Sequence, residues 1–316
     1  MLTPIKLKSV CKEIIWGGNR LKNEYNKVSS LNNIAESWEL TVRDDGMNTI
    51  NGGEFDGLTM QEYIDKNGFE VVSNKPSDRF PLLIKFIDAE DNLSIQVHPD
   101  DEYGMKTANS LGKTEMWYVI DAKPGAKLVY GLKENCSVSM LKDAIENGTV
   151  EETLNYVSVK KGDVFFIPSG LVHAIGAGIL LAEIQQNSNI TYRVYDYNRK
   201  DKNGNTRELH VSDALNVIVN RNEVEIDKIR FSANVKNENT LACCEYFNVE
   251  RFSVYGAYEF SANAESFNSI LCLDGNGKIV HNGKSYDLVK GDSYYIPANL
   301  GKYTVEGNVE IIVSKL

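Results

Sequence analysis

The sequence predicts a mainly β protein made of two related β modules, with helical insertions in the first module. Two observations support this fold class. Segments rich in β-branched and aromatic residues recur between turn residues at spacings of about 8 to 12 positions, as in sandwiches and barrels. The segment KGDVFFIP at 161–168 also recurs as KGDSYYIP at 290–297. A repeat of this length indicates two copies of one structural unit.

Each predicted element has a local reason. Strands are bounded by turn residues, and Pro168 closes one of them because proline cannot continue a central ladder. Helices are predicted where apolar residues recur four apart, as with Leu141 and Ile145 before the helix-ending Gly148. The predicted strands are 81–89, 92–98, 115–122, 126–132, 162–168, 178–186, 268–275, 286–297 and 309–316. The predicted helical segments are 59–66, 137–148 with its continuation 149–156, and 210–219.

The two copies of the repeat differ at one chemically important position. His173 follows Pro168 at the same spacing at which Lys302 follows Pro297. This difference indicates that the first copy holds a ligand site and that the second copy is a scaffold. We therefore predict a first domain at 1–235 that carries the site, and a second, degenerate domain at 236–316 without metal ligands.

Charge and composition exclude several classes of protein. The chain has 316 residues, and 44 Asp and Glu against 34 Lys and Arg give a formal net charge of −10. A binder of nucleic acid or of an anionic membrane needs a basic surface to displace counterions, so neither partner is expected. No run approaches the roughly 18 to 20 apolar residues of a membrane span, and the N-terminus lacks the apolar stretch of a signal peptide. We therefore expect a cytoplasmic protein.

The distribution of histidine and cysteine predicts what kind of metal site the chain could form. The five cysteines are scattered without a CxxC spacing, which indicates reduced, structural thiols. Gln96 and His98 are two residues apart in a predicted strand and so project from one face. Glu115 begins the next strand, and His173 follows the repeat. Two imidazoles, a carboxylate and an amide oxygen suit zinc, iron, manganese or another divalent ion, with a position left open for substrate.

Six segments follow one another through most of the first 220 residues: WGGNRL, ESWEL, PLLIKFIDAEDNLSIQVHPDD, GKTEMWYVI, GDVFFIPSGLVHAIGAGILLAEIQQ and YRVYDYNR. In this collinear order they closely resemble the type I mannose-6-phosphate isomerases in their short bacterial form. The resemblance implies a double cupin, with two β-barrel or jelly-roll modules. It also implies an enzyme that interconverts mannose 6-phosphate and fructose 6-phosphate with one divalent metal ion, usually zinc. The expected partner is a small sugar phosphate, and the expected assembly is a monomer or a homodimer.

The resemblance assigns roles to individual residues. It implies metal ligation by the four residues already selected by their chemistry, which are Gln96, His98, Glu115 and His173. It implies a catalytic arginine at Arg193. It also implies a site lysine at Lys113, which serves either as an acid and base or as a phosphate ligand.

One position departs from the family pattern. The family commonly has an aspartate four residues before its catalytic arginine, and Asn189 occupies that position here. An amide cannot accept a proton as a carboxylate does, so the acid role of that aspartate does not transfer to this chain. Two alternatives therefore stay open, which are another metal-dependent cupin enzyme acting on a sugar phosphate and a non-catalytic sugar-binding cupin.

Overall fold

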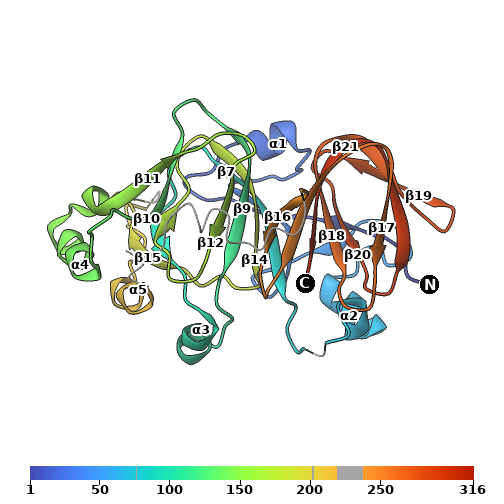
Figure 1. Ribbon diagram of the computed structural model, residues 1–316, viewed down its shortest axis with the longest axis horizontal. Helices are drawn as coiled ribbons and strands as arrows, with labels where there is room; N and C mark the ends of the chain where they lie inside the picture. Colours follow the sequence, from blue (N-terminus) through green and yellow to red (C-terminus); the bar gives the residue numbers. More distant parts are fainter. Residues whose placement is uncertain (76, 201–202, 219–237) are drawn as a thin grey trace.

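A six-stranded antiparallel sheet lies between the two other large sheets of the protein (Figure 1). The structure is a computed structural model that describes residues 1–316 except 76, 201–202 and 219–237. The central strands β7 and β14 are buried along their whole length because both faces of the sheet are covered, and their sequences therefore read as nearly continuous apolar runs. In spatial order the strands are β12 (Val164–Ile167), β9 (Glu115–Ala122), β14 (Ile179–Gln186), β7 (Leu82–Ala89), β3 (Glu36–Leu40) and β2 (Val10–Lys12).

A five-stranded sheet faces one side of the six-stranded sheet, and the core between them includes Trp117, Leu128 and Phe165. Its outer face packs against Leu141 of α4 (Val138–Asn147) and Ala214 of α5 (Val211–Val217). Helix α4 begins where the Ser137 hydroxyl accepts a hydrogen bond from the backbone N–H of Met140 at 3.1 Å. The strands, in spatial order, are β11 (Leu154–Ser158), β10 (Lys127–Leu132), β13 (His173–Ala174), β8 (Ile95–Val97) and β15 (Tyr192–Tyr195).

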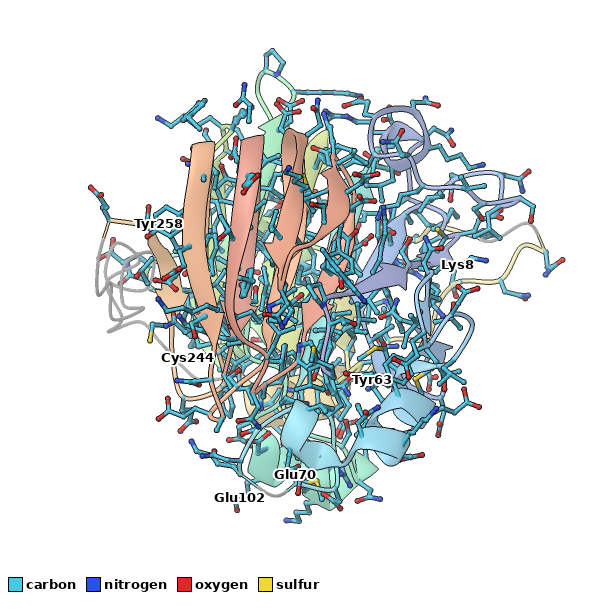
Figure 2. All side chains as sticks on the ribbon, turned by 90° about the vertical axis from the view of Figure 1, so that its right-hand side faces the viewer. Lys8, Tyr63, Glu70, Glu102, Cys244 and Tyr258 are labelled. Atoms are coloured by element: carbon cyan, nitrogen blue, oxygen red, sulfur yellow. The ribbon has the colours of Figure 1, made fainter. Side chains whose placement is uncertain are left out.

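An eight-stranded sheet covers the other side of the six-stranded sheet, across a core that includes Phe86, Tyr118 and Ile312. Figure 2 shows this sheet from outside, with Lys8 at one side and Tyr63 of α2 (Met60–Asn67) below. Seven strands follow the order β16 (Thr240–Cys243), β17 (Asn248–Ala262), β21 (Gly301–Lys315), β18 (Asn268–His281), β20 (Ser293–Ile296), β1 (Ile5–Lys8) and β6 (Thr49–Ile50), and β19 (Lys284–Val289) pairs with β18. The N-terminal strands β1 and β6 thus complete the sheet of the C-terminal module.

The remaining elements are short. They are α1 (Arg20–Glu24), the hairpin β4 (Val42–Arg43) and β5 (Gly46–Met47), the 3₁₀ turns η1 (Phe69–Val71) and η2 (Val150–Thr153), and α3 (Asp101–Ala108). Within the described residues, no helix is long and apolar enough to span a membrane.

The two copies of the repeat form the same turn. Gly162 and Gly291 adopt φ angles of 87° and 88°, a left-handed conformation that glycine tolerates. The aspartate that follows each glycine accepts a hydrogen bond from the backbone N–H three residues before it. These bonds are 3.0 Å at Asp163 and 2.9 Å at Asp292. The prediction of two related β modules is therefore confirmed at the level of backbone geometry.

The predicted fold class is confirmed, because the large sheets face one another as open sheets, as in a jelly roll, and do not close into barrels. Several predictions of detail are wrong. The segment 149–156 is not helical throughout, because Leu154 pairs with Leu132 and begins β11 after one 3₁₀ turn. Only Ile95–Val97 of the predicted strand 92–98 forms β8, and the sequence predicted neither α3 nor the long strand β17. The end of the predicted helix at 219 and the predicted domain boundary at 235–236 both lie outside the described residues.

Candidate active site

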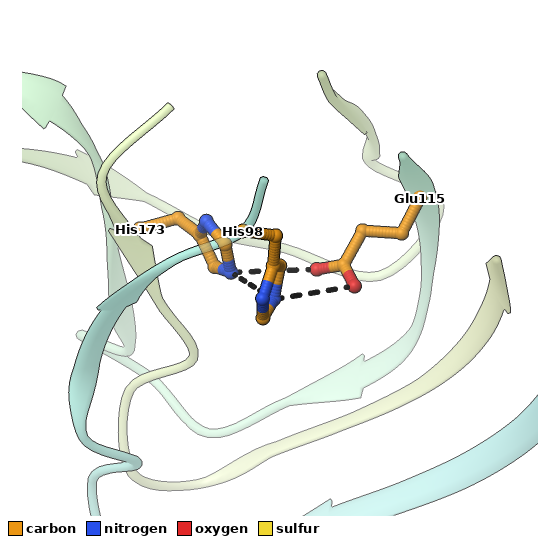
Figure 3. A group of neighbouring side chains, drawn as sticks. All are labelled: His98, Glu115 and His173. Atoms are coloured by element: carbon orange, nitrogen blue, oxygen red, sulfur yellow. Dashed lines mark hydrogen bonds and ion pairs between the residues drawn. The ribbon is translucent and has the colours of Figure 1, made fainter. Parts of the chain in front are cut away.

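Three buried side chains converge between the five-stranded and six-stranded sheets (Figure 3). His98 follows β8, and His173 begins the neighbouring strand β13, opposite Gln96 in the strand register. Glu115 is the first residue of β9, in the facing sheet. The candidate ligand atoms of His98, Glu115 and His173 all lie within 4.8 Å of one another. The turn after the repeated strand therefore delivers His173 to residues that come from two other strands.

The donor atoms of this cluster point toward one another. The Nε2 atoms of His98 and His173 are 3.1 Å apart. The Glu115 carboxylate lies 3.7 Å from Nε2 of His98 and 3.5 Å from Nε2 of His173. The side-chain nitrogen of Gln96 is 3.4 Å from Nε2 of His173. All four residues that the sequence predicted as metal ligands are thus brought together.

Backbone contacts determine which ring nitrogen of each histidine faces the cluster. Nδ1 of His98 lies 2.8 Å from the carbonyl oxygen of Ile190, and Nδ1 of His173 lies 2.8 Å from that of Leu171. A carbonyl oxygen only accepts hydrogen bonds, so Nδ1 carries the proton in each ring and Nε2 presents a lone pair. Burial lowers the pKa of His173 to about 3 and, with the Lys113 charge, holds the pKa of His98 well below its ordinary value. Both rings are therefore neutral at pH 7.

This donor set fits a divalent metal ion. Two lone pairs and a carboxylate that face one another in a buried site repel one another, and a divalent ion among them would offset this repulsion more fully than the single Lys113 charge beside His98 and Glu115. Bonds of about 2.0 to 2.1 Å from one metal leave its ligand atoms roughly 3 Å apart, which matches the separation of the two Nε2 atoms. In addition, Oε1 of Glu115 is buried and has no hydrogen-bond partner among the residues that the structure describes. Imidazole, carboxylate and amide ligands suit zinc and several other divalent ions.

Lys113 lies directly beside the candidate ligands. Its Nζ is 3.0 Å from Nε2 of His98 and forms an ion pair with the Glu115 carboxylate. The side chain is only 4% exposed. Burial and the nearby Glu183 carboxylate raise the pKa of Glu115, and the Lys113 charge opposes that rise. Lys113 therefore supplies a cation at the floor of the site.

A cavity of about 290 Å³ opens onto this floor. Gln96, Lys113 and Arg193 all line it. Arg193 lies in β15 opposite Gln96, and its guanidinium donates to the Ser94 hydroxyl at 3.3 Å and to the Glu208 carbonyl at 2.8 Å. A larger cavity of about 720 Å³ lies elsewhere, beside Tyr156 and Tyr197, and is lined by none of the predicted site residues. The smaller cavity is therefore the one lined by predicted site residues.

Comparison with known proteins agrees with this geometry. Residues 5–155 match the catalytic domain of phosphomannose isomerase type I, and residues 237–316 match the mannose-6-phosphate isomerase cupin domain. The chain is 38% identical to mannose-6-phosphate isomerase ManA of Bacillus subtilis over 321 aligned residues, covering 99% of each protein. It belongs to the type I phosphomannose isomerase family.

Other members and the family fold support this assignment. The mannose-6-phosphate isomerase of Streptococcus mutans is 35% identical, with 99% of this chain and 98% of that protein covered. The crystal structure of the mannose 6-phosphate isomerase from Bacillus subtilis superposes with a TM-score of 0.89 at 35% identity, over 99% of this chain and 100% of that one. The chain therefore shares the cupin-type fold of this phosphomannose isomerase, as the sequence predicted.

The structure gives a physical reason for the amide at Asn189. Asn189 lines the cavity, and its side-chain N–H donates to the Asp45 carboxylate at 3.0 Å. Burial alone would raise the pKa of Asp45, but hydrogen bonds from Arg43 and Asn189 and the Arg43 charge lower it. A second carboxylate at position 189 would face Asp45 across a hydrogen-bond distance. An acidic group is thus present behind the cavity, from the β4–β5 hairpin.

Charged residues inside the buried strands are the part of the site that the sequence prediction missed. Lys85 of β7 lies 3.2 Å from Glu183 of β14 and 3.4 Å from Glu36 of β3, and all three line the cavity. Glu183 also accepts a hydrogen bond from the Trp117 indole at 2.9 Å. The signal was available, because a charge within an otherwise apolar strand such as LLIKFIDA must have buried partners.

Proposed function

We propose that this chain is a metal-dependent aldose–ketose isomerase that interconverts mannose 6-phosphate and fructose 6-phosphate. The observation that carries the proposal is the His98, Glu115 and His173 group in direct contact with Lys113, which lines a cavity together with Arg193. The names of the curated relatives support the same reaction.

The residues that would hold the metal are Gln96, His98, Glu115 and His173. A divalent ion bound there, zinc being usual for this family, supplies a Lewis acid for the oxygens on C1 and C2 of the sugar. Burial keeps both imidazoles neutral, and the Nδ1 contacts with carbonyl oxygens leave Nε2 of each ring facing the metal position. Loss of any of these four side chains is therefore expected to weaken metal binding.

The reaction requires two proton movements. In the direction from aldose to ketose, a proton leaves C2 and a proton is added to C1, while a hydroxyl hydrogen leaves O2 and one is added to O1. The Lys113 side chain lines the cavity and contacts the candidate ligand His98, so it can reach a sugar that lies beside the metal ligands. We assign to Lys113 the exchange of protons with the substrate, and to Arg193 the stabilisation of the negative oxygen that develops.

The remaining predictions concern organisation. The candidate ligands, Lys113 and Arg193 all fall between positions 96 and 193, which supports a first domain at 1–235 as the catalytic part and 236–316 as scaffold. The cytoplasmic location and the monomeric or homodimeric state stay predictions. Sedimentation velocity of the purified chain distinguishes the two assemblies.

A coupled assay for fructose 6-phosphate formation tests the function. The protein is assayed as purified, after removal of metal with a chelator, and after addition of zinc, manganese or cobalt. We expect activity on mannose 6-phosphate that disappears with the chelator and returns with at least one metal. Glucose 6-phosphate and unphosphorylated mannose serve as comparison substrates. A folded, metal-loaded protein that converts only another sugar phosphate, or none, contradicts the proposal and favours a different cupin enzyme or a sugar-binding role.

A further inference from the structure

A cluster of arginines surrounds one buried carboxylate beside the cavity. Arg207 donates to both oxygens of Asp196 through Nε and Nη2, at 2.7 and 2.5 Å. Arg199 also pairs with the Asp196 carboxylate and donates to the Asn92 carbonyl. Burial alone would raise the pKa of Asp196, but hydrogen bonds from Arg207 and Arg199 lower it. Asp196 therefore stays ionised and holds the Arg207 guanidinium in a fixed orientation.

Cations outnumber carboxylates among the residues that line the cavity, and the Glu115 and Asp196 carboxylates lie behind Lys113 and Arg207. Arg193 and Arg207 both line the cavity. The pKa of Arg193 is lowered, first by its own burial and second by the nearby positive charge of Arg207. The lining includes the four cations Lys85, Lys113, Arg193 and Arg207, and only the two carboxylates Glu36 and Glu183. The nearby acids Asp91 and Glu208 are exposed. In a chain with a net charge of −10, such a cavity favours an anionic ligand.

The cations differ in depth and in what they already contact. Lys113 is almost fully buried and is engaged with His98 and Glu115. Lys85 is equally buried and is engaged with Glu36 and Glu183. The Arg207 side chain is 29% exposed, and its hydrogen bonds to Asp196 use one edge of the guanidinium. Among the described residues no hydrogen bond involves its Nη1, so that edge is available to a ligand that enters the cavity.

We propose that Arg207, oriented by Asp196, binds the phosphoryl group of the substrate at the outer part of the cavity, so that the other end of the sugar reaches Lys113 and the metal ligands. A planar guanidinium fixed by a carboxylate on one edge presents its remaining N–H groups to an anion at little entropic cost. Lys113 is then left for proton transfer. The inference rests on the proposed function for the identity of the sugar, but the anion site can be tested without turnover.

The test measures binding of glucitol 6-phosphate, an unreactive hexitol phosphate, to the metal-loaded protein by titration calorimetry. The variants are Arg207→Gln, which removes the positive charge, and Arg207→Lys, which keeps the charge but lacks the planar guanidinium with its paired N–H donors. Arg251→Gln is the matched control, because Arg251 donates to Glu310 at 2.6 Å in the other module and does not line this cavity. Inorganic phosphate is titrated in competition, to separate a site for free phosphate from one for the sugar phosphate.

We expect Arg207→Gln to weaken binding by about 10- to 100-fold, the usual effect of losing a charge-assisted hydrogen bond. Arg207→Lys should recover part of the loss, and Arg251→Gln should bind like the unaltered protein. The bound metal of Arg207→Gln should match that of the control, whereas its unfolding temperature should be lower, because the buried Asp196 carboxylate loses one of its two arginine partners. Unchanged binding by Arg207→Gln, or no binding of glucitol 6-phosphate by the unaltered protein, overturns the inference. Binding without isomerase activity supports the anion site and contradicts only the proposed reaction. Stronger binding of free phosphate than of the hexitol phosphate also overturns the inference.

Discussion

The two modules share a backbone turn but differ in the chemistry that surrounds it. In the first module Ile167 pairs with Glu115, and His173 is fully buried. In the second module the matching Ile296 pairs with Asn268, and Lys302 takes the place of the histidine. Lys302 is 75% exposed and pairs with Glu259 on the surface. A turn that places a side chain at one position therefore does not by itself create a site.

The difference teaches that the neighbouring strands decide what the turn can do. Asn268 is buried, but its amide donates to the Tyr303 hydroxyl at 2.9 Å and to the Ser261 carbonyl at 3.1 Å. These groups satisfy each other without a cation. In the first module, Oε1 of Glu115 has no hydrogen-bond partner among the described residues and the two Nε2 atoms face each other at 3.1 Å, so that module suits a metal where the second does not.

Exchange of the ligand position gives the largest expected effect. His173→Gln removes one imidazole from the first module, and we expect loss of the bound metal and of activity, because losing even a supporting residue costs about 10- to 100-fold in metal affinity. Elemental analysis of the purified variant and the coupled assay measure the two losses.

Lys302→His is the reciprocal variant and the control. We expect no additional metal, because the second module offers Asn268 where the first has Glu115. A second bound metal in Lys302→His, or full metal content in His173→Gln, would show that the turn alone is sufficient.

Substitution of the two lysines sharpens the comparison. Lys113→Ala removes the buried cation beside the ligands, and we expect turnover to fall by about 10²- to 10⁴-fold, the usual contribution of a general acid or base. Metal content is measured in parallel, so that a change in kcat with metal retained is separated from loss of the ion. Lys302→Ala removes an exposed lysine and should leave kcat and KM unchanged; a rate for Lys113→Ala near that of Lys302→Ala would remove Lys113 from the mechanism.

The repeated glycines provide the smallest and most direct test. Gly162→Ala places a side chain at positive φ in open space, which costs about 1 kcal/mol of unfolding free energy. Gly291→Ala has the same φ, but its Cβ would lie 2.1 Å from the Tyr25 carbonyl oxygen. We expect a cost of about 2 to 4 kcal/mol, because the backbone must shift as in an overpacked core. Urea unfolding of both variants compares them, and equal costs would contradict the difference in packing.

Local sequence predicted the repeat, about half of the strands and the four candidate ligands because each has a short-range signature. The repeat is eight residues long, and Gln96 and His98 follow the alternation of one strand. The missed features depend on contacts between distant segments. Lys85 becomes part of the cavity only through Glu36 and Glu183 on neighbouring strands. Likewise, Leu154 begins a strand because it pairs with Leu132, against the local helical pattern.

The pairing of Ile5 with Tyr295 and of Leu7 with Ile50 has a consequence for synthesis of the chain. During translation the N-terminal strand leaves the ribosome first, yet its partner β20 is made only near the end. The edge of β1 that faces β20 therefore stays unpaired until almost the whole polypeptide has emerged, and closure of this long loop carries an entropic cost that the final module must repay. Fragments cut between the modules would divide the eight-stranded sheet, with β1 and β6 in one piece and the other six strands in the second, and co-expression of the two pieces should restore structure that neither attains alone.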